Sequence, residues 1–493
     1  EISACLVGSE MCIRDRSRTS YIDAQNYPSP AFDVASVAAN IVDASAGLSE
    51  YAIESYFARL SLAYKDRYVV NATIRTDGSS RFAPDCRWGW FPSVSVGWNV
   101  SNESFWNAEK TDLKIRASYG RTGNQDGISN YGWQALISGG VNYGGQSGIA
   151  ISSSGNDRLT WETADQYNAG FDLSFLGGKI NMIADVYLKN TNNLLYSKPV
   201  HATTGETSIL SNIGSMRNKG VEFTINTHLN LGKVLWSSSF NIARNVNKLT
   251  SLLEDDLLSI GANRALKLGR TVGSWYIFRT DGIYQYDGEV PQALYDKGVR
   301  AGDVKYWDRN GDGNITDDDR IVTGNPNPKF SGGWNNTFKY KGLELSLFFT
   351  YSYGNDVYAS WMIHGSKPGY TRSLLKAYAD NRWTGPGTSD KYPRAIYSYS
   401  GWNGKNSTMY LTDGSFIRLR SVTLGYTFPQ RLVSKIHLKG LRVYAQGDNV
   451  FLCSRYPGWD PETSVNLDPR FYGEDNDGVP QPRIFKLGVN ITF

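Results

Sequence analysis

The chain has 493 residues, of which 40% are hydrophobic, 20% charged and 13% aromatic, and 51 Lys and Arg against 47 Asp and Glu leave a net charge of +4. This composition excludes a disordered chain, and four Cys beside 50 Gly exclude a disulfide scaffold. Because the charges nearly balance, there is no broad basic field, and nucleic acid is not expected as a partner. No window reaches the ~18 consecutive apolar residues of a membrane-spanning helix, which excludes a helical membrane protein but leaves a barrel open.

The first residues, 1–16, read EISACLVGSEMCIRDR and carry charged residues around a short apolar stretch. They lack the basic start and the long apolar centre of a signal peptide. We interpret residues 1–16 as a non-native leader and 17–55 as a partial upstream segment of the barrel or its loops. The chain is then expected to be a fragment whose N-terminal part is missing, with its main domain over 56–493.

Beyond residue 56 the dominant pattern has period two, which places alternate side chains on opposite faces of a strand. In 219–229, Val221, Phe223 and Ile225 share one face and Glu222 and Asn226 the other. The segments 166–176 and 483–493 alternate in the same way. In them we expect Phe171, Leu173, Leu487 and Val489 to point outward and Asp172 to point inward. About 13 strands are predicted, most with the ~9–11 residues of a membrane-spanning strand: 56–64, 68–76, 92–100, 113–121, 166–176, 179–189, 219–229, 235–245, 330–340, 343–353, 414–428, 439–450 and 483–493.

The connections between these strands alternate between short and long. Residues 65–67, 177–178, 230–234 and 341–342 form tight turns, whereas 77–91, 122–165, 190–218, 246–329, 354–413 and 451–482 are long and polar. Outer-membrane barrels have short periplasmic turns and long extracellular loops. The fold class expected is therefore all-β, an antiparallel transmembrane β-barrel that is incomplete, with the rival of a soluble β-sandwich or propeller. Its first and last strands, 56–64 and 483–493, are expected to leave an open edge or to close on each other.

Several short motifs occur in order along the chain: 159–162 (LTWE), 218–222 (NKGVE), 302–306 (GDVKY), 326–330 (PNPKF), 413–419 (DGSFIRL), 424–429 (LGYTFP) and 447–451 (GDNVF). The chain ends with an aromatic-terminated strand at Phe493. Together these motifs resemble, in family order, the starch-utilisation-type (SusC/RagA-like) TonB-dependent outer-membrane transporters of the Bacteroidetes. The resemblance covers about residues 55–493.

The resemblance implies the C-terminal barrel portion of an importer of oligosaccharides or peptides in the Gram-negative outer membrane. Its implied partners are outer-membrane lipid, a SusD-like surface lipoprotein and the TonB system, the last through the missing N-terminal part. A siderophore or cobalamin receptor is the rival within the class. From other classes, a soluble all-β glycan-binding protein and a β-rich surface hydrolase remain. No HExxH, Walker, GxSxG or dinucleotide motif occurs, so an enzyme is not expected.

Residues 308–319 (DRNGDGNITDDD) reproduce the spacing of an EF-hand-like calcium loop. The expected Ca²⁺ ligands are the side chains of Asp308, Asn310, Asp312 and Asp319 and the backbone carbonyl of Asn314. Gly313 allows the sharp turn, but the twelfth position is Asp rather than the usual Glu. A metal-free acidic turn is the alternative.

The segment from Tyr353 to Asp413 concentrates aromatic residues among Gly and Asn. Aromatic rings beside amides suit sugars or peptides, and they could equally pack against a partner protein or form a small core within the loop. The candidate substrate-binding residues are Trp361, Tyr370, Trp383, Tyr399 and Trp402.

Overall fold

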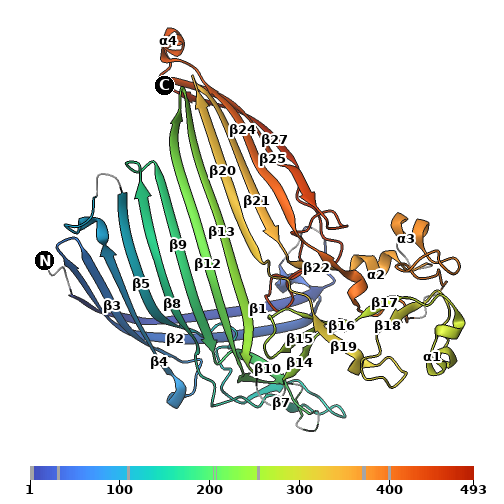
Figure 1. Cartoon of the computed structure of the whole chain (residues 1–493). Coiled ribbons are helices and arrows are strands. Elements are labelled where there is room, and N and C mark those ends of the chain that lie inside the picture. The colour runs from blue at the N-terminus through green and yellow to red at the C-terminus, as the bar shows by residue number, and fades with distance from the viewer. Residues whose placement is uncertain are drawn as a thin grey trace. The chain divides into compact units, whose positions relative to one another are not determined.

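The computed structural model describes residues 5–29, 31, 34–107, 111–201, 203, 205–206, 208–252, 256–368, 373–397 and 401–493. Within these residues, fourteen strands form one sheet whose strand order follows the chain (Figure 1). They are β1 (Cys5–Gln25), β2 (Asn40–Tyr64), β3 (Tyr68–Ser79), β4 (Trp88–Asn99), β5 (Thr111–Asn124), β8 (Glu162–Phe175), β9 (Ile180–Asn192), β12 (Ser215–Leu231), β13 (Val234–Ser251), β20 (Phe330–Tyr340), β21 (Leu343–Tyr353), β24 (Phe416–Thr427), β25 (Gly440–Ser454) and β27 (Ile484–Thr492).

The 13 predicted strands are confirmed, and two differences appear at the start of the sheet. The predicted strand 56–64 is the second half of β2, and β1 precedes it as an additional strand. β1 pairs with β2 over most of its length, for example Ser17 opposite Ser49. Residues 5–16 therefore lie in a strand rather than in a separate segment. That residues 1–16 are foreign to the protein stays a prediction, because backbone pairing does not depend on where a sequence comes from.

The chain divides into two compact units. One comprises residues 1–99, 116–168 and 189–216, and within it the small strands β6 (Leu136–Gly139) and β7 (Ile149–Ser153) pair, as do β10 (Leu195–Pro199) and β11 (Ser208–Asn212). Its buried cluster is formed by Phe82, Phe91, Ile128, Leu159 and Trp161. The other unit comprises residues 100–115, 169–188 and 217–493 and contains the last six strands of the sheet with their long loops.

The connections between the strands of the sheet confirm the predicted alternation between short turns and long loops. Residues 65–67, 176–179, 232–233 and 341–342 join neighbouring strands directly, whereas 252–329, 354–415 and 455–483 separate others. In the second unit, Figure 1 shows the long loops at one end of β20 and β21, opposite the end that carries helix α4 (Gln430–Val433). Positive φ angles make the tight turns possible, as at Lys341 (45°) and Gly342 (89°).

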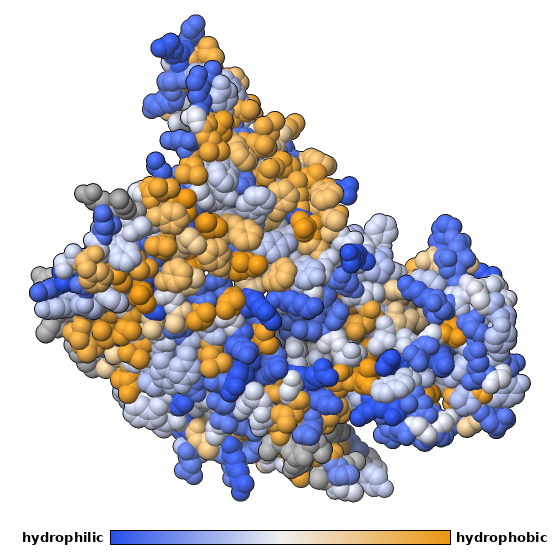
Figure 2. Space-filling model, in the orientation of Figure 1, coloured by the Kyte–Doolittle hydropathy of each residue, from blue (hydrophilic) through white to orange (hydrophobic). Residues whose placement is uncertain are grey.

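The strand register separates an apolar from a polar face in β20, β21 and β24. Leu345 and Leu347 of β21 lie opposite Leu424 and Val422 of β24, whereas Ser346 between them lies opposite Thr423. A β-bulge in β24 between Leu419 and Ser421 shifts the period by one residue. The apolar residues Ile417 and Leu419 before it, and Val422 and Leu424 after it, therefore stay on the same face. Figure 2 shows hydrophobic residues gathered over these strands.

The seven residues predicted to point outward lie in continuous strands, so their alternation with Glu222, Asn226 and Asp172 is confirmed. Val221, Phe171, Leu487 and Val489 are exposed, and Leu487 retains 89% of its accessible surface. Glu222 is exposed as well, so exposure alone does not separate the two faces. Which face meets lipid stays a prediction.

Among the described residues, β1 and β27 are the two edges of the sheet, so the expectation of an open edge is confirmed. The first edge belongs to β1 and not, as predicted, to residues 56–64. No helix within the described part of the chain is long and apolar enough to span a membrane.

The apolar face can be tested with a charge at the centre of β21. We expect Leu347→Arg to cost roughly 2–4 kcal/mol of folding free energy in a bilayer, because the guanidinium would face hydrocarbon. Ser346→Arg, one residue away on the polar face, is the matched control and should cost much less. The measurement is reversible denaturant unfolding in lipid vesicles. Equal losses from both substitutions would show that the two faces are not divided between lipid and lumen.

Candidate functional site in the long loops

The long loops of the second unit fold into a body with its own core. We call this the loop body and define it as the described residues of 256–329, 354–415 and 455–483. Its small strands form three sheets, β14-β15-β16-β19, β17-β18 and β23-β22-β26. Their bounds, with those of the helices in the loop body, are β14 (Leu257–Ile260), β15 (Arg264–Lys267), β16 (Trp275–Phe278), β17 (Thr280–Ile283), α1 (Gln292–Asp296), β18 (Val304–Tyr306), β19 (Arg320–Thr323), β22 (Asp356–Ala359), α2 (Trp361–Gly365), α3 (Lys376–Asn381), β23 (Leu411–Asp413) and β26 (Glu474–Asp475).

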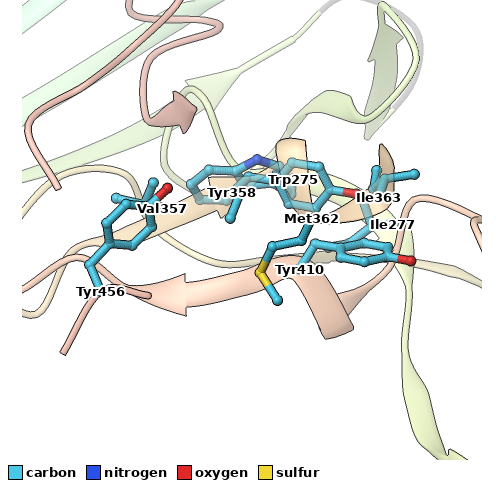
Figure 3. Close-up of a cluster of buried hydrophobic side chains, with 9 residues drawn as sticks. Trp275, Ile277, Val357, Tyr358, Met362, Ile363, Tyr410 and Tyr456 are labelled. Atoms are coloured by element: carbon cyan, nitrogen blue, oxygen red, sulfur yellow. The ribbon is translucent and has the colours of Figure 1, made fainter. Parts of the chain in front are cut away.

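Two apolar clusters hold the loop body together. The first gathers Trp275, Ile277, Val357, Tyr358, Ala359, Met362, Ile363, Tyr410 and Tyr456 from all three long loops (Figure 3). In it, the Tyr358 ring stacks on Trp275 with centroids 6.3 Å apart and meets Tyr410 edge-on at 6.2 Å. The second is formed by Phe278, Ile283, Tyr284, Val290, Leu294, Val299, Val304, Tyr306 and Ile315. Many of the aromatic side chains of these loops are therefore buried in a core.

The Tyr456 hydroxyl joins this core to the surface. It accepts a hydrogen bond from the Trp361 indole Nε1 (3.0 Å) and donates one to Asp475 Oδ2 (2.5 Å). Asp475 is only 4% exposed, and its Oδ1 accepts the backbone N–H of Gly478 (2.9 Å). Burial, followed by the hydrogen bond to Asp475, raises the pKa of Tyr456, so the phenol keeps its proton and remains a donor at neutral pH.

Strand pairing places Asp475 at this point. β26 pairs in parallel with β22, with Glu474 opposite Tyr358 and Asp475 opposite Ala359. Ser360 adds a hydrogen bond from Oγ to the Asp475 carbonyl (2.9 Å). The backbone of Asp475 is thus fixed by residues of another loop more than a hundred positions away.

A pocket of about 660 Å³ lies beside this arrangement. The apolar part of its lining consists of Trp361, Leu375, Pro457, Trp459, Val479 and Pro480, and its charged groups are Asp475 and Asp477. Trp459 is 83% exposed and Val479 is 86% exposed, so the rim of the pocket presents apolar surface to solvent. Of the residues predicted to bind substrate, Trp361 lines this pocket.

The other predicted aromatic residues have different surroundings. Trp383 and Trp402 pack against the second cluster, where their indole Nε1 atoms donate to Gln285 Oε1 (3.2 Å) and to the Val304 carbonyl (2.8 Å). These two side chains therefore fit the alternative interpretation, in which the aromatic residues form a small core within the loop. Tyr370 and Tyr399 lie outside the described residues. A role of this set in substrate binding stays a prediction.

The predicted calcium loop is a chain of turns in which side chains accept backbone N–H groups. Asp308 accepts from Gly311 (2.7 Å) and Gly313 (2.8 Å). Asn310 accepts from Asp312 (3.0 Å), and Asp312 accepts from Asn314 (2.7 Å). Gly313 has a φ of 76°, a conformation that glycine adopts without strain. The loop is therefore closed by hydrogen bonds from its own backbone to its own side chains.

Asp319, at the last position of this loop, is fully buried. Its carboxylate accepts the backbone N–H groups of Arg309 (2.9 Å) and Thr316 (2.7 Å), the second as part of a capping box at the 3-10 turn η6 (Asp317–Asp319). Lys297 donates to the Asn314 side-chain oxygen (2.7 Å). Within the described residues no group of three or more His, Cys, Asp and Glu side chains is placed to hold a metal ion. Calcium binding here stays a prediction.

Two paired cations in the loop body, buried Arg264 and half-buried Arg394, have no signal in the sequence pattern. Arg264 is fully buried, its guanidinium 4.1 Å from the centre of the Trp275 ring, and it donates to the Tyr472 carbonyl (3.0 Å). Burial lowers its pKa to about 10. Arg394 donates to both oxygens of buried Asp303 (2.9 and 3.0 Å), which raises its pKa. Tyr472 and Asp303 are distant in sequence from the cations that they hold, so only the folded chain identifies these pairs.

The sheet with tight turns on one side and long folded loops on the other defines an outer-membrane β-barrel chain. Residues 13–450 match the TonB dependent receptor-like β-barrel family. The chain belongs to this family, whose members lie in the outer membrane of Gram-negative bacteria.

Curated relatives show how much of the family's length the chain represents. TonB-dependent receptor P39 of Formosa agariphila is 31% identical over 483 residues, which cover 90% of this chain and 46% of the relative. TonB-dependent receptor P26 of the same organism is 35% identical over 467 residues, with 90% and 46% covered. TonB-dependent receptor SusC of Bacteroides thetaiotaomicron is 31% identical over 464 residues, with 89% and 43% covered. The chain spans about half the length of the curated relatives it matches.

Among solved structures, that of the RagAB peptide transporter superposes with a TM-score of 0.84 at 23% identity, covering 99% of this chain and 53% of that chain. This likeness shows a shared fold. With the match to SusC, it confirms the SusC/RagA-like resemblance seen in the sequence motifs.

The hydrogen bonds that the Tyr456 hydroxyl makes to Trp361 and Asp475 can be tested by removing that hydroxyl. We expect Tyr456→Phe to destabilise the loop body by about 1–3 kcal/mol, because buried Asp475 would lose a hydrogen-bond donor. The measurement is amide hydrogen exchange of β22 and β26 in the detergent-solubilised protein. Tyr397→Phe is the control, since that side chain is 84% exposed. Unchanged protection of β26 in Tyr456→Phe would contradict the role given to the hydroxyl.

Proposed function

We propose that this chain is the C-terminal barrel portion of a TonB-dependent outer-membrane importer of oligosaccharides or peptides. The observation that carries the proposal is the family match over residues 13–450, together with long loops that fold into a body with a pocket. A relative named SusC and the fold shared with a peptide transporter support the class of cargo. Because the chain spans about half of its relatives, import is a property proposed for the whole protein.

The partners follow from the same argument. We propose that the whole protein works with a SusD-like surface lipoprotein and draws energy from the TonB system. The match to SusC and the fold shared with the RagAB peptide transporter support a lipoprotein partner for this chain. The loop body would bind and pass on cargo and would perform no catalysis. A siderophore or cobalamin receptor remains the second candidate within the family.

Uptake by the source bacterium tests the proposal. We expect deletion of the gene that encodes the full-length protein to abolish growth on one oligosaccharide or peptide source, and complementation to restore it. Growth under iron or cobalamin limitation is measured in parallel. A defect confined to iron or cobalamin limitation would favour the second candidate. Co-purification of a surface lipoprotein with the tagged full-length protein tests the partner.

We further propose that residues 308–319 bind Ca²⁺. Each carboxylate or amide oxygen has two lone pairs, so an oxygen that accepts one backbone N–H can still bind a cation. Asp308, Asn310 and Asp312 would supply side-chain oxygens, Asn314 its carbonyl and Asp319 its carboxylate. A bound ion would order this loop of the extracellular side without taking part in chemistry.

Calorimetry of the detergent-solubilised full-length protein tests the calcium proposal. We expect Ca²⁺ to bind, and the double variant Asp308→Asn and Asp312→Asn to lose that heat because two carboxylate charges are removed from the loop. Asp390→Asn, at an exposed position outside the loop, is the control. The same heat in the double variant as in the unaltered protein would exclude this loop as the site.

A further inference from the structure

The pocket beside Trp361 combines apolar walls with carboxylates. Its volume, about 660 Å³, lies within the ~300–1,000 Å³ of small-ligand sites. It is lined by residues of 354–415 and 455–483, two long loops that the barrel places on the extracellular side. Cargo arriving from outside would therefore reach it before entering the barrel.

The polar side chains of the pocket accept hydrogen bonds much more than they donate them. Asp475 and Asp477 are acceptors when ionised, and the Trp361 N–H is already used by Tyr456. Apart from the indole of Trp459, no side chain among the described residues of the lining has a donor for a ligand. A neutral sugar ring offers acceptors as well as donors, so it would leave its acceptors without side-chain partners here. A protonated amine offers donors alone.

The charge of Asp475 favours the same ligand. Its oxygens accept from the Tyr456 hydroxyl and from the Gly478 N–H, both neutral groups. The ion pairs defined among the described residues do not include it, although it is 4% exposed. A carboxylate that is buried without a cation is costly, and a cation that enters the pocket would offset part of that cost.

The rim adds an aromatic surface. Trp459 is 83% exposed and lies in the lining with Pro457 and Val479. An exposed indole attracts a cation to its face and also covers the apolar carbons next to an amine. Asp477 is exposed at the rim, so it can attract the cation before Asp475 holds it.

We propose that this pocket binds a protonated primary amine of the cargo, carried next to an apolar chain or ring. The inference rests on the proposed import function and narrows it to cargo with a positive charge. Two sources carry this chemistry, the lysine side chain of a peptide and the amino group of an unacetylated amino-sugar oligomer. In both, acetylation removes the charge and keeps the rest of the molecule.

Binding of matched ligand pairs to the full-length protein in detergent tests the proposal. One pair is a lysine-containing tripeptide and its Nε-acetyl form, and the other is a glucosamine oligomer and its N-acetylated form. At least one free amine should bind more tightly than its acetylated partner, about tenfold or more, because a hydrogen bond to a charged group contributes ~1.5–3 kcal/mol. The pair that shows the difference identifies the source.

Variants locate the binding. Asp477→Asn should weaken the free amine about tenfold and leave the acetylated form unchanged, since one charge–charge contact is lost. The backbone should tolerate this change because Asp477 has a φ of 62°, a conformation that Asn also adopts. Trp459→Ala should weaken the free amine about threefold to tenfold through loss of the cation–π contact. Asp390→Asn and Tyr397→Ala, exposed positions outside the pocket, are the matched controls.

The outcomes separate this inference from the proposed function. The proposal of an amine-binding pocket is wrong if the acetylated forms bind as well as the free amines, if no probe binds, or if Asp477→Asn does not weaken binding. In each of these cases the import function is still decided separately, by the uptake experiment in the bacterium. If the free amine binds through Asp477 but deletion of the gene affects no uptake, the amine-binding pocket is supported and the proposed import function is contradicted.

Discussion

The structure depends on one constraint, that a backbone inside a bilayer finds no water to hydrogen-bond. Strands meet this constraint only when each pairs with neighbours on both sides, as the twelve strands between the edges β1 and β27 do in the sheet. The pairing leaves side chains to alternate between two faces. In β21 this places Leu345 and Leu347 on one face and Ser346 on the other. The bulge in β24 shows that the apolar face is maintained even where the strand period is interrupted.

The long loops obey the opposite constraint, because they lie in water and cannot rely on lipid to cover apolar side chains. They bury aromatic residues from three separate loops in a common core around Trp275 and Tyr358. Tyr456 belongs to that core and at the same time holds Trp361 and buried Asp475, both of which line the pocket. A pocket can therefore have defined walls although no barrel strand contributes to its lining.

Strand positions could be predicted because a period of two is a local property that each strand carries in its own residues. The bulge at Arg420 and the pairing of β1 with β2 could not, since they concern the register between two strands. The substrate-binding residues predicted between Tyr353 and Asp413 were harder to identify for a related reason, because the burial of a side chain depends on contacts with distant segments. Trp361 and Trp383 look alike in the sequence and each packs against an apolar cluster, but Trp361 also lines the pocket. The turns of residues 308–319 are closed by side chains a few positions away, so a local pattern of residues can specify them.

The amino-acid sequence alone determined the strands of the sheet after β1, their alternating faces, the sequence of short and long connections and the motifs that place the chain in its family. All of these depend on residues close together along the chain. The tertiary structure decided which aromatic rings are buried, where Arg264 and Arg394 find their partners, and that Asp475 lies beside Trp361. Those contacts join residues separated by about a hundred positions or more, and their free energy depends on burial, which no short segment of sequence specifies.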